Sequence, residues 1–88
     1  SIYVGHALAP NALAERAHVV RGLTALVKAP DETLDRHALR AAMNVSEANL
    51  PHVLRIMVDS RLIEPVDPDG KSYALSRIGK LRTASAAN

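Results

Sequence analysis

The segment LIEPVDPDGKSYAL, near the end of the 88-residue chain, limits the possible folds more than any other stretch. Its DPDG sequence at 67–70 suits a type I turn, with Pro68 first in the bend and Gly70 at positive φ. The residues on either side, 62–66 and 72–75, are predicted to form the two strands of a hairpin. Because most of the preceding chain has helical periods, this hairpin must close an otherwise helical domain.

The first predicted helix runs from about Asn11 to Lys28, where apolar residues recur at three- and four-residue steps. Pro30 ends it, because proline disfavours α geometry in the residue before it. Residues 33–34 can then form a very short strand, and Asp35 is suited to cap the helix that follows.

That second helix should turn Ala38, Leu39 and Ala42 inward and carry Arg36 and Arg40 on its outer side. It should end near Asn44, since asparagine tolerates the left-handed conformation that often closes a helix.

A third helix follows, and Leu50, Val53, Leu54 and Met57 form its inward stripe. Pro51 leaves two positions for its start. The helix could begin at Ser46 with a distorted first turn, which is slightly favoured, or at Asn49 with Pro51 in the first turn. Two short helices joined by about three residues form a helix-turn-helix, and the hairpin behind them would be a wing.

From about Val19 to Arg82 the chain resembles the winged-helix domains of bacterial regulators of the IclR and MarR type. The residues that carry this resemblance are TLDRHALRAAMNVS, NLPHVLRIMVDSRLIE and DGKSYALSRIGKL. Met57 stands in a leucine position of the pattern, and Arg61 replaces its glycine. A similar pattern occurs in the dimerisation domains of O-methyltransferases, which do not touch DNA, so the fold alone does not decide the function.

The resemblance implies a mainly α fold with a small β-hairpin wing: a three-helix core with a two- or three-stranded antiparallel sheet. We expect this winged helix-turn-helix domain to span residues 11–82. Residues 1–10, which lack a clear period, are predicted to be an N-terminal arm, and residues 83–88 a disordered tail.

If the domain binds double-stranded DNA, the outward face at the start of the third helix would read bases in the major groove. Asn49, His52 and Arg55 are the predicted base contacts, and Ser46 could bind a phosphate. Glu47 on the same face would accept a hydrogen bond from cytosine or repel the phosphate backbone of the DNA.

Phosphate contacts are expected from Arg36 and Arg40, and from Lys71 or Ser72 at the wing. Arg77, Lys80 and Arg82, which follow the wing, could also hold phosphates. The acids Glu64, Asp67 and Asp69 surround Lys71 and make this wing a poor probe of the minor groove.

Other classes of function have little support. The chain has no cysteine, and its four histidines show neither H-x-x-x-H spacing nor a companion carboxylate at ligand spacing, so we expect no metal or cofactor. It has no nucleophile elbow or phosphate loop, which argues against an enzyme. No apolar run is long enough to cross a membrane, and the absence of cysteine suits the cytoplasm.

The expected function is therefore sequence-specific DNA binding, by a cytoplasmic bacterial transcription regulator. The alternative is a winged helix used for protein–protein contact or dimerisation without DNA. A net charge of only +2 and the acidic wing favour the alternative, whereas the polar face and eight arginines favour DNA. Apolar residues of the arm and first helix predict a homodimer in either case.

Overall fold

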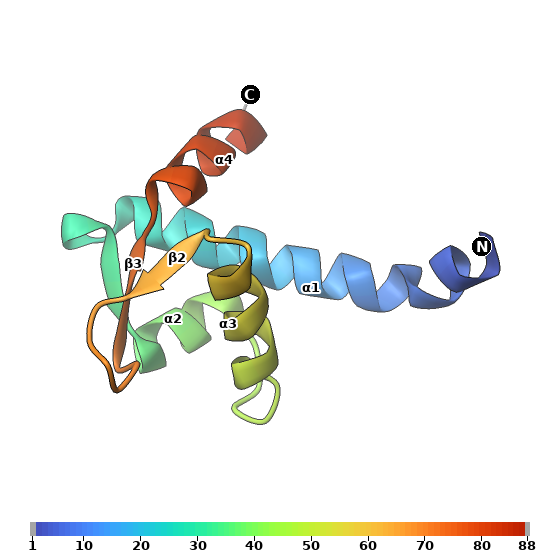
Figure 1. Cartoon of the computed structure of the whole chain (residues 1–88), viewed down its shortest axis with the longest axis horizontal. Helices are drawn as coiled ribbons and strands as arrows, with labels where there is room; N and C mark the ends of the chain where they lie inside the picture. Colours follow the sequence, from blue (N-terminus) through green and yellow to red (C-terminus); the bar gives the residue numbers. More distant parts are fainter. Residues whose placement is uncertain (1, 88) are drawn as a thin grey trace.

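The computed structural model describes the backbone of residues 2–87 and the side chains of residues 15–83. This part of the chain is mainly helical, with one small antiparallel sheet, which confirms the predicted fold class at this level (Figure 1). Its elements, in chain order, are α1 (Ile2–Lys28), the 3-10 turn η1 (Pro30–Glu32), β1 (Thr33–Asp35), α2 (Arg36–Met43), α3 (Leu50–Asp59), β2 (Ile63–Pro65), β3 (Ser72–Leu75) and α4 (Arg77–Ala87).

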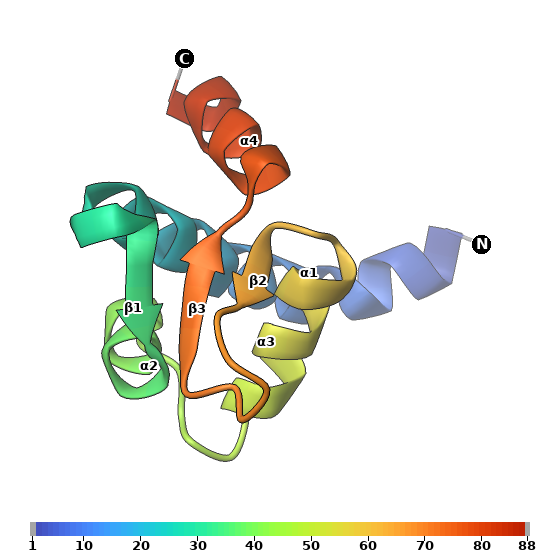
Figure 2. The ribbon, with the colours of Figure 1, turned by 60° about the vertical axis from the view of Figure 1, so that its left-hand side comes forward.

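The sheet has the order β1–β3–β2, and both outer strands run antiparallel to β3 (Figure 2). Tyr73 at the centre lies opposite Leu34 on one side and Pro65 on the other. The predicted turn at 67–70 is present: Gly70 has a φ of 67°, and its N–H donates to the carbonyl of Asp67 at 3.2 Å. The Asp67 carboxylate also accepts from the N–H of Lys71, so one of the acids at the hairpin tip stabilises the turn itself.

One apolar core fills the space between α1, α2, α3 and the sheet. Among its fully buried side chains, α1 contributes Leu26, α2 contributes Leu39 and Met43, α3 contributes Met57, and the sheet contributes Ile63. The predicted inward stripe of α3 is confirmed, since all four of its residues are buried. This packing holds α3 against α1 and leaves the opposite face of α3 exposed.

Two helix ends follow a Schellman pattern, in which a left-handed residue lets the last carbonyls find donors. At the end of α2, Asn44 has a φ of 56°, as the sequence predicts, and the Val45 N–H bonds the Arg40 carbonyl. At the end of α3, Arg61 has a φ of 61°, and the Leu62 N–H bonds the Met57 carbonyl. Arg61 therefore stands where a glycine would be unstrained, at the position where the sequence pattern lacks its glycine.

We expect Arg61→Gly to raise the free energy of unfolding by about 0.5–1 kcal/mol. An L-residue in the left-handed region loses roughly 1–2 kcal/mol, and the greater freedom of glycine in the unfolded chain offsets part of that gain. Chemical denaturation measures the change. Asn44→Gly is the matched control and should gain less, because asparagine tolerates this conformation. A loss of stability in Arg61→Gly would contradict this account of the turn.

Three predicted boundaries are wrong. The helix expected from Asn11 begins at Ile2, so the backbone of the arm is helical as far as the structure describes it, from residue 2. The tail expected to be disordered is helical as far as Ala87. The tail holds three alanines among its six residues, and alanine has the highest helix propensity.

The third error concerns α3, which begins at Leu50 and not at Ser46. Pro51 then lies in the first turn, where its missing N–H costs nothing. The connection from α2 therefore has six residues, 44–49, and not three. Ser46 still orders this connection, because its Oγ accepts from the Asn49 N–H and its carbonyl accepts from the Leu50 N–H.

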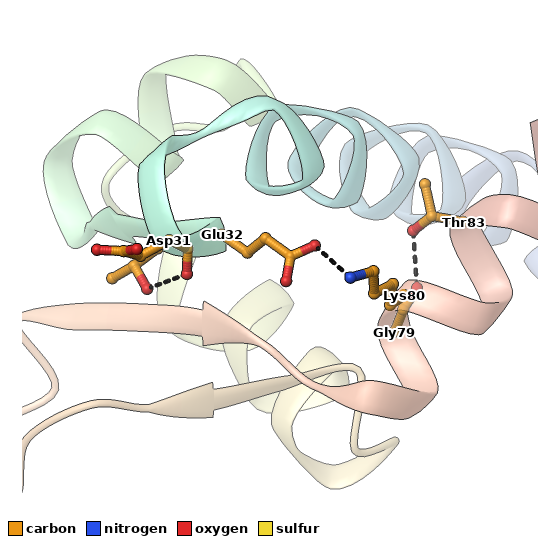
Figure 3. A network of polar contacts seen from close by, with 6 residues as sticks. Asp31, Glu32, Gly79, Lys80 and Thr83 are labelled. Atoms are coloured by element: carbon orange, nitrogen blue, oxygen red, sulfur yellow. Dashed lines mark hydrogen bonds and ion pairs between the residues drawn. The ribbon is translucent and has the colours of Figure 1, made fainter.

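The start of α4 is locked to the loop that follows α3. Ser76 is buried; its hydroxyl donates to the Arg61 carbonyl and accepts from the Gly79 N–H, and its own N–H donates to the Leu62 carbonyl. On the other side of α4, Lys80 Nζ lies 3.3 Å from Glu32 Oε2 (Figure 3). These contacts attach the first turn of α4 to both η1 and the end of α3.

Candidate nucleic-acid interface

The exposed face of α3 and the connection before it is polar. Asn49, His52 and Arg55 follow one another at three-residue steps, and all three are exposed, as predicted. Ser46 and Glu47 are exposed on the connection. No large apolar side chain of α3 is exposed. The predicted base-reading residues therefore share one accessible surface, on the side of α3 opposite the core.

His52 on this face is already engaged. Its Nε2 lies 2.8 Å from Oε1 of Glu15 on α1, although the two residues are 37 positions apart in the chain. Both side chains remain partly accessible, at 57% for His52 and 36% for Glu15. While this contact holds, a DNA base could be met only by the other ring nitrogen, Nδ1. Sequence reasoning missed Glu15, since nothing local connects α1 with α3.

Arg55 is more accessible than His52. Its Nε lies 3.8 Å from the carboxylate of Asp59, one turn further along α3, and the two side chains are 82% and 72% exposed. An exposed pair at this spacing contributes little and can exchange for another partner. Arg55 also lines a shallow groove of about 430 Å³ between α3 and the hairpin, and Arg36 of α2 lines the same groove.

A second hollow, of about 500 Å³, lies between α2, the tip of the hairpin and the connection before α3. We call it the α2–hairpin hollow. The predicted phosphate-binding residues Arg36, Arg40 and Lys71 all line it. The Arg36 N–H donates to the Lys71 carbonyl at 2.7 Å, and this bond fixes the hairpin tip against the first turn of α2. The fold thus brings together cations that are up to 35 residues apart in the sequence.

The charges of the α2–hairpin hollow are mixed. Asp35, Glu47 and Asp69 line it together with the three cations, and so does His37 of α2. Asp35 is used by the fold, because its carboxylate caps α2 by accepting from the Ala38 N–H. Glu47 and Asp69 oppose any anion that enters the hollow.

Arg40, which the sequence places on the outer side of α2 with Arg36, is half-buried, as Arg36 is. Its Nη1 donates to the Val45 carbonyl at 3.2 Å, beyond the end of α2. Its Nε is buried without a hydrogen-bond partner among the described residues. Val45 is itself buried. Arg40 therefore stabilises the turn after α2, and only part of its guanidinium is accessible from the α2–hairpin hollow.

The two serines differ in accessibility. Ser46 is exposed, but its hydroxyl already accepts a hydrogen bond from the backbone of Asn49. Ser72 is half-buried in β3, opposite Asp35 of β1, and its carbonyl accepts from the Val66 N–H. Ser72 therefore belongs to the sheet, whereas Lys71 extends from the tip.

A scan against protein-family models found no match to this chain, and a search of curated proteins found no significant relative. Within residues 2–87, no helix combines the length and the hydropathy that crossing a membrane requires. Among the described side chains, those of residues 15–83, no three histidine or acidic groups gather where they could hold a metal ion.

Proposed function

We propose that this domain is a winged helix-turn-helix that binds double-stranded DNA. Helix α3 would lie in the major groove, with Asn49 and Arg55 at base edges and His52 beside them. Arg36 and Lys71 would hold the phosphate backbone on one side of α3, and the β2–β3 hairpin would serve as the wing. In this proposal the protein is a cytoplasmic bacterial transcription regulator that needs no cofactor.

One surface carries the proposal. The exposed side of α3 is polar, and Arg36 of α2 and Lys71 of the hairpin line the hollows beside it. Arg36 lines both the groove beside α3 and the α2–hairpin hollow, and so connects Arg55 with Lys71. A surface built for an apolar protein partner would instead expose large hydrophobic side chains on α3. The order of the elements, with a hairpin after the third helix, fits a helix-turn-helix with a wing.

The alternative is a winged helix that contacts proteins and not DNA. The acids of the α2–hairpin hollow favour it, since Glu47 and Asp69 face the place where a phosphate would bind. The two functions differ in their response to salt, because phosphate contacts release counterions on binding.

The test is binding to random-sequence duplex DNA, measured by fluorescence anisotropy at several salt concentrations. We expect Arg36→Ala/Arg55→Ala to weaken binding by at least roughly a hundredfold at low salt, since each hydrogen bond from a charged group contributes about 1.5–3 kcal/mol. Because Arg36 is the proposed phosphate contact of this pair, the slope of log affinity against log salt should become shallower by about one.

Arg77→Ala/Arg82→Ala is the matched control. It removes the same charge from α4, which lies at the opposite end of the molecule from the hairpin tip (Figures 1 and 2). The affinity of this control variant for DNA should fall much less than that of Arg36→Ala/Arg55→Ala. Equal losses in both variants would mean that net charge, and not this surface, drives binding. No binding to DNA even at low salt would refute the proposal for this domain and leave the protein–protein alternative.

A further inference from the structure

The exposed large hydrophobic side chains of the described residues lie outside α3, and two of them line a groove between α1 and α4. Within the described range, exposed large hydrophobics on α1 are Val20 and Val27, and on α4 Ile78 and Leu81, the last at 64% exposure. An apolar groove of about 300 Å³ lies between the two helices and is lined by Val20, Leu23 and Val27 from α1 and by the end of α4. A patch of this kind on a small domain marks an interaction surface.

The N-terminal half of α1 needs a partner of its own. It extends away from α2, α3 and the sheet in both views (Figures 1 and 2). Residues 1–14 contain no aspartate, glutamate, lysine or arginine, and Gly5 and Pro10 interrupt their helix propensity. A short helical segment with these two residues is unstable in water unless packing against another surface stabilises it.

The sequence of α1 shows how an N-terminal half of this helix could cover the apolar groove between α1 and α4. Positions 2, 6, 9, 13, 16, 20, 23 and 27 follow alternating steps of four and three residues, which is the spacing of a coiled-coil seam. They hold Ile, His, Ala, Leu, Arg, Val, Leu and Val, so six of the eight are apolar. Of these, Leu23 already packs in the core of its own chain at 7% exposure and forms the floor of the groove between Val20 and Val27. The series is symmetric about its midpoint between positions 13 and 16. Two copies of α1 in antiparallel orientation therefore match, with position 9 opposite position 20 and position 2 opposite position 27.

We propose that the occupant of the α1–α4 groove is a second copy of this chain. In this two-fold dimer, the N-terminal half of each α1 packs antiparallel against the C-terminal half of the other, beside its α4. The uncharged segment 2–14 of each molecule would cover the exposed Val20 and Val27 of the other. The two-fold symmetry forms this contact twice and leaves neither surface free for a third molecule. This inference does not depend on DNA binding.

The test is the molar mass of the intact chain in solution, measured by sedimentation equilibrium over a range of concentrations. We expect twice the 9.4 kDa of one chain for the unchanged protein. Val20→Glu should weaken the dimer at least about tenfold, because a carboxylate would be buried against position 9 of the partner. Val66→Glu is the control, because Val66 is also exposed but lies at the end of β2, outside the groove.

A charge pair tests the register itself. Ala9→Lys/Val20→Glu places opposite charges face to face in the proposed antiparallel pair and should recover most of the affinity that Val20→Glu loses. A monomer at the highest attainable concentration would overturn the proposal. So would a dimer that Val20→Glu leaves intact, or a failure of the double variant to recover dimerisation while circular dichroism shows it to be folded.

Discussion

Gly79→Ala is expected to lower the free energy of unfolding by about 3 kcal/mol, which corresponds to a fall in Tm of roughly 12–24 °C for a domain of this size. A Cβ atom at position 79 would overlap the carbonyl oxygen of Leu62 and lie 2.9 Å from Cδ1 of Leu75. The Leu62 carbonyl cannot give way freely, because it accepts the Ser76 N–H. Helix α4 would have to move off the sheet, and the gain of about 1 kcal/mol in helix propensity does not offset that.

Gly22→Ala is the matched control for this prediction. The atoms nearest to its Cβ are Sδ and Cγ of Met43, at 2.8 and 2.9 Å, and Cε of Met57. They belong to unbranched methionine side chains, which can change rotamer more easily than a backbone carbonyl can move. Thermal unfolding followed by circular dichroism should show a loss below about 1.5 kcal/mol. Similar losses at both glycines would refute the special role of the contact between α4 and Leu62.

The second large effect is expected in the core. Leu39→Ala should cost about 2–5 kcal/mol, because Leu39 is fully buried and its removal leaves a cavity that α2 can only partly close. A domain of this length has a total stability of only about 4–13 kcal/mol, so the variant should be partly unfolded at moderate temperature. Denaturation with urea measures the loss directly.

Val66→Ala is the control for the core prediction. Val66 is 57% exposed at the hairpin, and its truncation should change stability by no more than about 0.5 kcal/mol. A loss below about 1 kcal/mol in Leu39→Ala would mean that α2 does not pack into the core as described.

Part of the candidate site could be predicted because it depends on helical periodicity. The apolar stripe of α3 places Leu50, Val53 and Met57 inward, and the exposure of Asn49 and Arg55 follows from that geometry. The grouping of Arg36 with Lys71 around one hollow was expected only through the resemblance to winged-helix domains. The partner of His52 could not be predicted, because Glu15 lies on α1, which only the folded chain brings near. Arg40 bonds the Val45 carbonyl, five positions further along the chain, across the left-handed end of α2.

The sequence by itself determined the helix caps and the tight turn of this protein. The Asp35 cap, the left-handed Asn44 and the Asp67–Gly70 turn each involve residues within four positions of one another, so short-range sterics and hydrogen bonds suffice. Only the tertiary structure decided the place of Glu15 beside His52, the burial of the Arg40 Nε and the close approach of Gly79 to Leu62. These contacts join different elements, and their distances are set by how the common core packs, which no local pattern encodes.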